Sequence, residues 1–304
     1  MHRAQPHPRA RLYPPPVLDR FACYEACVQS PRHVTAFLRA VHAHQPLVLR
    51  EDFCGTAAVS RRWIAEAARQ GESARAVGVD LDDEALARAA LEARRAGVDH
   101  ALHLLRADVL ALDLASPHAQ RPTPRAGALH PDPDAADVVF VGNFSLGYIH
   151  ARADLITYLR RSRQRLARGN AGFGGGIFAC DLYGGASAFT LGGLERTHPG
   201  PGRELVRYAW RHDRADPLTG MVENSISFRV EVDAQIVAEH PRAFTYRWRL
   251  WSIAEVREAL AEAAFARSAV YKDIPVAPGQ TPEPVTDPEH LSKDWVVIVV
   301  GFCD

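Results

Sequence analysis

The sequence lacks an excess of charge of either sign, because its 36 basic residues are balanced by 36 acidic residues. Without a net positive charge it has no strong field to attract nucleic acid or an anionic membrane. No apolar run is long enough to cross a bilayer, and the first residues lack the apolar stretch of a secretory signal. We therefore expect a cytoplasmic protein with neither a nucleic-acid nor a membrane partner.

Cysteines are few and do not form a metal-binding pattern. The five cysteines make an odd count, and without a signal peptide this predicts a reduced protein. Cys23 and Cys27 lie four positions apart, and no second pair follows at zinc-finger spacing. We expect these two on one face of a short helix, and we predict no metal site.

Short apolar segments alternate with helical segments in the first part of the chain. Strands separated by helices in this way form a parallel sheet with right-handed crossovers, so the expected fold is α/β and doubly wound. The last helix and a wholly apolar strand come at 252–264 and 295–300. The other expected strands are 47–49, 74–80, 101–106, 137–141 and 176–180, and the other expected helices are 57–69, 82–95 and 154–166.

The pattern changes to a period of two within residues 204–251. Apolar and polar side chains alternate there, and the segment Asp216–Gly220 is a strong turn signal between two of the runs. This predicts a small antiparallel sheet, inserted into the α/β fold at residues 186–251, that forms a lid. The remaining chain divides into a flexible tail at 1–18 and a core made of 19–185 and 252–304.

Polar side chains follow the strands of the expected parallel sheet. In such a sheet the ligand lies outside the carboxyl ends of the strands, near the point where the strand order reverses. Glu51 or Asp52 at the first turn can hold an ammonium group. Asp80 can accept both hydroxyls of a ribose, and Asp108 can accept an adenine amino group. Asn143 and Asp181 follow the next two strands. The pattern predicts a nucleoside-like ligand.

The first turn contains only one glycine. It runs from Glu51 through Phe53, Gly55 and Thr56 to Ala57. A dinucleotide needs the pattern G-x-G-x-x-G, because its pyrophosphate approaches the backbone closely at a helix N-terminus. The single glycine therefore favours a ligand without phosphates.

Several segments resemble one enzyme family in order and spacing. Residues 51–57 resemble the first motif of class I S-adenosylmethionine-dependent methyltransferases, an acidic residue followed by a glycine-rich turn. Val77–Asp80 resembles the second motif and Arg106–Val109 the third, while residues 251–265 resemble the late helix. The segment Gly142–Tyr148 is similar to small-molecule N- and O-methyltransferases, including glycine N-methyltransferase-like enzymes.

The sequence departs from this family at glycine positions. Phe53 and Ala57 replace two glycines of the first turn, which tightens it, and Ala264 replaces a third just before Phe265. The resemblance implies S-adenosylmethionine as the cofactor. Its expected contacts from the core are Glu51, Cys54, Gly55, Thr56, Asp80, Leu81, Asp108, Val109, Asn143 and Phe144.

Residues 19–44 precede the first strand and have helical spacing, interrupted by Pro31. An amphipathic segment in this place has few surfaces to cover other than the ligand edge. We therefore expect both of its helices to close over the cofactor, with Tyr24 in contact with it.

The resemblance implies methyl transfer to nitrogen, oxygen or sulfur of a small molecule. We expect Ser145, Asp181 and Arg249 to bind the acceptor, and an arginine of the insert to hold a polar or anionic group on it. His150, Tyr148 and Tyr183 are the candidates for a catalytic role. The aromatic residues of 208–251 are expected to form the core of the insert.

Two other functions remain open at this level. One is an RNA or protein methyltransferase on the same fold, which the neutral charge disfavours. The other is a non-catalytic cofactor-binding subunit, which the intact ribose and adenine positions disfavour. The sequence also leaves open whether the protein forms a homo-oligomer.

Overall fold

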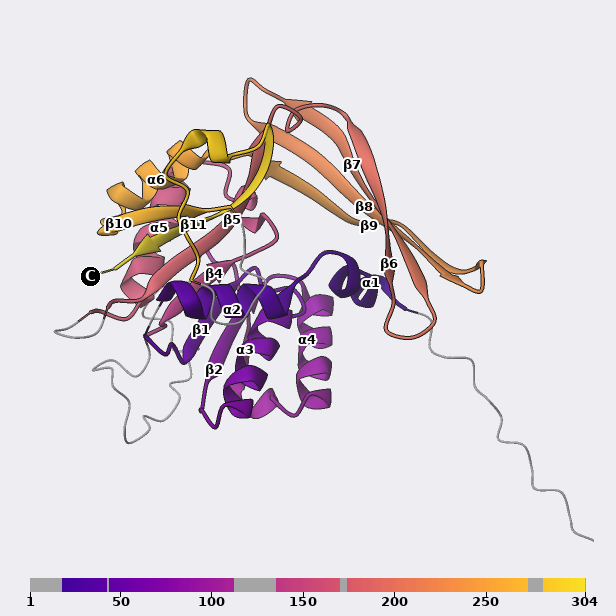
Figure 1. The fold of residues 1–304 in the computed structure, drawn as a ribbon, viewed down its shortest axis with the longest axis horizontal. Helices are drawn as coiled ribbons and strands as arrows, with labels where there is room; N and C mark the ends of the chain where they lie inside the picture. Colours follow the sequence, from indigo (N-terminus) through magenta and orange to yellow (C-terminus); the bar gives the residue numbers. More distant parts are fainter. Residues whose placement is uncertain (1–17, 43, 112–134, 170–173, 273–280, 304) are drawn as a thin grey trace, which may run out of the picture.

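The structure is a computed structural model that describes residues 18–42, 44–111, 135–169, 174–272 and 281–303 (Figure 1). The tail expected at 1–18 lies almost entirely outside these ranges. None of the helices within them is long and apolar enough to span a membrane.

A seven-stranded sheet forms the centre of the molecule. Strands β1 to β5 run parallel, and β11 runs antiparallel to both of its neighbours. The strand order reverses between β1 and β4, as the expected doubly wound fold requires. In spatial order the strands are β10 (Arg267–Tyr271), β11 (Asp294–Phe302), β5 (Ile177–Gly185), β4 (Val138–Val141), β1 (Val48–Asp52), β2 (Arg75–Asp80) and β3 (Leu102–Arg106).

Helices cover both faces of this sheet. Alternate residues of β4 show the division, because Val138 and Phe140 belong to one hydrophobic cluster and Val139 and Val141 to the other. The first cluster is covered by α2 (Pro31–His42), α3 (Ala58–Arg69) and α4 (Asp83–Arg95), and the second by α5 (Arg152–Arg165) and α6 (Ile253–Glu262). Short 3₁₀ helices lie at Asp99–Ala101, Ser145–Tyr148 and Pro288–His290.

The insert is a separate antiparallel sheet of four strands. It consists of β6 (Gly192–Pro199), β7 (Leu205–Asp216), β8 (Met221–Val232) and β9 (Gln235–Arg249), paired in that order. The alternation in the sequence predicted β7, β8 and β9. It did not reveal β6, which is an almost fully exposed edge strand with two glycines, a terminal proline and no apolar alternation.

The N-terminal segment forms two helices with different surroundings, and α2 begins at Pro31 as the sequence indicated. Helix α1 (Arg20–Cys27) lies between the insert and the helices α3 and α4 (Figure 1), and its Cys23 is buried in the cluster of the insert. In contrast, Phe37 and Leu38 of α2 are buried in the core beneath the central sheet. The expectation that both helices form a lid is therefore wrong for α2.

Ala264, which replaces a glycine of the family, occupies a position where the backbone conformation favours glycine. Ala264 follows Ala263, the C-cap of α6, and has a left-handed conformation with φ of 65°. The Phe265 amide donates to the Leu260 carbonyl at 3.0 Å, which closes the helix as a glycine-type cap. An alanine in this conformation costs about 1–2 kcal/mol relative to a relaxed backbone.

Replacing Ala264 with glycine is therefore expected to raise the free energy of unfolding by about 0.5–1 kcal/mol, after the larger entropy of the unfolded glycine chain is deducted. Urea denaturation measures the change. The matched control is Ala261→Gly, an exposed position inside α6, which should lose about 1 kcal/mol. Equal destabilisation by both variants would contradict the cap assignment.

Candidate active site

The first turn keeps the backbone of a glycine-rich loop although it holds only one glycine. Phe53, Gly55 and Ala57 all have left-handed conformations, with φ of 56°, 52° and 53°. The two residues that replace glycines thus adopt the conformation that glycine adopts without strain. Gly78 of β2 leaves room for this turn, because a Cβ atom there would lie 2.9 Å from the Cys54 sulfur.

Asp80, at the end of β2, fixes the turn from the neighbouring strand. Its Oδ2 accepts a hydrogen bond from the Gly55 amide at 2.7 Å, and its Oδ1 accepts one from the Asp82 amide at 2.9 Å. Each carboxylate oxygen has a second lone pair, so both can still accept a bond from a ligand hydroxyl.

Apolar and acidic groups continue this edge beyond Asp80. Leu81 exposes 58 % of its surface, whereas Val109 is buried. Asp108 is exposed after β3 and accepts the Leu110 amide at 2.9 Å. The ends of β2 and β3 thus present two carboxylates with an exposed leucine beside them, in the order that the sequence predicted.

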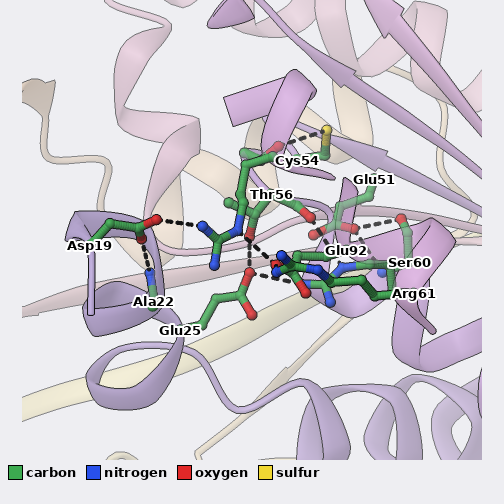
Figure 2. A network of polar contacts seen from close by, with 12 residues as sticks. Asp19, Ala22, Glu25, Glu51, Cys54, Thr56, Ser60, Arg61 and Glu92 are labelled. Carbon is green, nitrogen blue, oxygen red and sulfur yellow. Dashed lines mark hydrogen bonds and ion pairs between the residues drawn. The ribbon is translucent and has the colours of Figure 1, made fainter. Parts of the chain in front are cut away.

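The two acidic residues of the first turn have different partners. Glu51 is buried and accepts hydrogen bonds from the Ser60 amide at 2.9 Å and the Ser60 hydroxyl at 2.5 Å (Figure 2). Burial raises the pKa of Glu51 to about 7, against the lowering effect of the Ser60 donors. Asp52 points to the other side of the sheet, where the Tyr158 hydroxyl donates to it at 2.8 Å and the Arg50 Nε lies 2.9 Å away.

The turn after β4 is held by a carboxylate of β5. Asn143 and Phe144 are both left-handed, with φ of 56° and 61°, and their amides donate to Asp181 at 2.9 and 2.7 Å. Burial raises the pKa of Asp181 to about 6, although these two donors favour the ionised form. Ser145 follows as the buried first residue of a 3₁₀ helix.

Aromatic side chains of the insert face this turn. We call the inward side chains of β7, β8 and β9 the aromatic face. The ring of Trp248 lies 6.1 Å from Phe144, 6.0 Å from Tyr148 and 6.4 Å from Tyr183, so the face contacts residues that follow β4 and lie in β5. These aromatic residues are therefore more than the core of the insert. The rings of the face are Tyr208, Trp210, Phe228, Phe244, Tyr246 and Trp248.

Helix α1 connects the insert to the first turn. Glu25 accepts hydrogen bonds from the Thr56 hydroxyl at 2.6 Å and from Arg61 at 2.7 Å (Figure 2). On its other side, the Tyr24 ring lies 4.9 Å from the Phe244 ring. Burial raises the pKa of Tyr24, and the nearby carboxylate of Asp181 raises it further. Tyr24 packs on the insert beside the Glu25 contact with the first turn, and its contact with a cofactor stays a prediction.

Two of the expected acceptor-side residues have partners elsewhere. His150 is exposed, and its Nε2 lies 3.0 Å from the Arg247 carbonyl. The Arg249 guanidinium donates to the His150 carbonyl at 2.9 Å and to Glu255 at 3.2 Å, and it lies over the Trp251 ring. Arg249 thus ties β9 to the core, while Tyr148 and Tyr183 do lie against the aromatic face.

Cys54 is buried, and burial raises the pKa of its thiol well above the usual range, so it is not a reactive thiolate. No cluster of three or more histidine, cysteine or acidic side chains suited to a metal ion occurs in the described part of the chain. The polar ends of β1, β2, β3, β4 and β5 form the candidate site.

No protein-family model and no curated protein matches the sequence. Solved structures do match: an S-adenosylmethionine-dependent methyltransferase of Clostridium acetobutylicum superimposes with a TM-score of 0.60 at 14 % identity, over 92 % of this chain and 96 % of that one. The sugar N-methyltransferase KedS8 of Streptoalloteichus gives 0.58 at 16 %, over 100 % and 99 %. The S-adenosylmethionine-bound amino pentose methyltransferase CalS10 of Micromonospora echinaspora gives 0.57 at 16 %, over 92 % and 95 %.

The chain has the fold of these methyltransferases. The resemblance of the sequence motifs to the class I family is thereby confirmed at the level of the fold, including the mostly parallel sheet and the separate antiparallel one. At these identities the likeness concerns the fold alone.

Proposed function

We propose that this chain is an S-adenosylmethionine-dependent methyltransferase that acts on a small molecule. The observation that carries the proposal is the first turn, which keeps three left-handed residues although two of them are not glycine, and which Asp80 holds through the Gly55 amide. A backbone strained in this way is retained where a function requires it.

The residues at the strand ends fit the parts of this cofactor. Asp80 is placed to accept the ribose hydroxyls, and the exposed Leu81 and Asp108 suit the adenine ring and its amino group. Glu51 suits the ammonium group, because a cation beside it compensates for the burial that raises its pKa to about 7.

The cofactor supplies an activated methyl group, so the protein itself needs to align the acceptor, exclude water and remove a proton where the acceptor carries one. Asp181 holds the Asn143–Phe144 turn in place. The aromatic face excludes water on the acceptor side, and α1 closes the side of the first turn through Glu25. Of the three candidates for a catalytic role, Tyr148 and Tyr183 are the two that contact the aromatic face.

A small acceptor suits this arrangement better than RNA or a protein. The side chains that face the strand ends from β7, β8 and β9 are uncharged, whereas RNA binding needs a basic surface that neutralises phosphates. The composition offers no net positive charge to add to it. Two of the structural neighbours are named as methyltransferases of a sugar and of an amino pentose, and this supports a small acceptor.

The test has two stages. Calorimetry with S-adenosylmethionine, S-adenosylhomocysteine and NAD should give binding of the first two only. Methyl-labelled cofactor with a nuclease-treated metabolite extract should then place the label in the small-molecule fraction, also at moderate salt. NAD binding of similar strength, or label only in RNA or intact protein, would overturn the proposal. Cofactor binding without any transfer would leave a non-catalytic binding subunit.

A further inference from the structure

Two polar residues of the aromatic face lie side by side near Tyr183. His212 of β7 and Asn224 of β8 are cross-strand neighbours, and Asn224 exposes only 1 % of its surface. The Asn224 Nδ2 donates to the Tyr183 hydroxyl at 3.2 Å. Its Oδ1 and the Nδ1 of His212 are buried and have no hydrogen-bond partner among the described residues.

The Asn224 amide is oriented with its Nδ2 toward the Tyr183 hydroxyl, which leaves Oδ1 buried without a donor from the described part of the chain. Buried polar atoms in native proteins almost always have partners, so an exception at a candidate site points to a group that binds there. Aspartates and arginines on the outer face of the insert do not reach these atoms. Asp213, next to His212 in sequence, pairs with Arg242 at 2.9 Å.

The surroundings of the pair are aromatic rings and the edge of the central sheet. The Tyr183 ring lies 6.1 Å from the His212 ring and 6.3 Å from the Trp210 ring, and Trp210 stacks with Tyr246 at 6.1 Å. Tyr183 is two residues beyond Asp181, which holds the turn after β4. Tyr183, Trp210, His212 and Tyr246 all remain partly exposed, so the described chain does not cover them completely.

The insert contributes no charged side chain to the inward surroundings of the pair. The inward positions of β7, β8 and β9 carry no charged side chain among the residues that the structure describes. On the outer face of the insert, Arg229 pairs with Glu239 at 2.9 Å. Burial lowers the pKa of His212, which keeps its ring neutral at pH 7. No arginine lies at these inward positions, so the expected contact between an arginine of the insert and a polar or anionic group of the acceptor stays a prediction.

We propose that Asn224 and His212, together with Tyr183, bind an uncharged hydroxyl or carboxamide group of the methyl acceptor. The apolar surface of that acceptor packs on Trp210 and Tyr246. This inference rests on the proposed methyltransferase function and specifies its substrate class: a molecule with a neutral polar group at this end, without a carboxylate or phosphate there. Asn224 and His212 are specificity-determining residues for that group.

The first experiment uses a metabolite extract split by anion exchange into a flow-through of neutral and cationic compounds and a bound anionic fraction. The wild-type protein and methyl-labelled S-adenosylmethionine should label the flow-through at least tenfold more than the bound fraction. Label confined to the bound fraction would overturn this inference while leaving the methyltransferase function intact. Absence of label in both, with S-adenosylmethionine not bound, would overturn the proposed function itself.

The second experiment uses Asn224→Leu and His212→Phe, with Thr245→Val on the exposed outer face of β9 as the matched control. Each of the first two should lower labelling of the flow-through at least tenfold at low extract concentration and much less at high concentration, with unchanged affinity for S-adenosylhomocysteine. Asn224→Leu removes a buried oxygen that has no hydrogen-bond donor in the described chain, so its thermal midpoint should be equal to or higher than that of the wild type. A lower midpoint with unchanged labelling would show a structural role instead.

Discussion

Replacing Asp80 with asparagine is expected to weaken the binding of S-adenosylhomocysteine by roughly 10- to 150-fold, which corresponds to about 1.5–3 kcal/mol. The carboxylate makes charge-assisted hydrogen bonds to the ribose hydroxyls, and the amide loses the charge and one of the acceptor atoms. Asparagine keeps one oxygen for the Gly55 amide, so the first turn should persist. Calorimetry measures the affinity.

Asp82→Ala is the matched control for this prediction. Asp82 lies two residues away and caps α4 by accepting the amides of Glu84 and Ala85. Its loss should cost about 1 kcal/mol of stability and leave the affinity unchanged. If Asp80→Asn binds S-adenosylhomocysteine as tightly as the wild type, Asp80 does not contact the ribose.

Replacing Asp52 with alanine is expected to lower the free energy of unfolding by about 3–5 kcal/mol. Asp52 is fully buried, and its loss leaves the Arg50 guanidinium, whose side chain is 12 % exposed, without its nearby carboxylate. The Tyr158 hydroxyl also loses its acceptor. Urea denaturation, monitored by tryptophan fluorescence, measures the loss.

Tyr158→Phe tests the same cluster with a milder change. It removes one hydrogen bond and leaves the Arg50–Asp52 pair, so we expect a loss of about 0.5–1.5 kcal/mol. The comparison separates the charge from the hydrogen bond. A loss for Asp52→Ala no larger than that for Tyr158→Phe would mean that Arg50 finds water when its partner is removed.

The sequence was sufficient for the order of the central elements and for the polar residues at the strand ends. Glu51, Asp80, Asp108, Asn143 and Asp181 all lie at the carboxyl edge of the sheet, because parallel strands separated by helices place their ends at one edge. The alternation within 204–251 likewise determined which side chains share a face. These patterns involve residues that are close together in the chain, so a single sequence is enough to detect them.

The sequence did not reveal what the apolar face of each element packs against, and it missed two strands. The amphipathic spacing of α2 shows that one side is buried, but it does not say that Phe37 and Leu38 enter the central core. The strands β6 and β10 are short or largely polar and gave no signal. The partners of Glu25 and Arg249 are likewise set by elements distant in sequence, so no local pattern identifies them.

At three positions the glycine pattern of the family is broken although the backbone conformation is kept. Phe53, Ala57 and Ala264 break the sequence pattern of the family, yet all three have positive φ values. The backbone contacts around the first turn, such as the Cys54 amide to the Val79 carbonyl at 2.9 Å, hold the loop in place of glycine's freedom. A motif comparison that counts glycines alone underrates such a site.

The placement of α1 also has a consequence for the order in which the protein folds during synthesis. Arg20 donates to the Ala243 carbonyl, a contact between residues 223 positions apart. An isolated helix of eight residues is not stable in water, so α1 depends on its contacts with α3, α4 and β9, and the last of these can form only when β9 has left the ribosome. Contacts of such long range form slowly. Of the described helices, α1 is therefore translated first but is among the last to complete its packing, and a chain that stops short of residue 243 lacks the contact of α1 with β9.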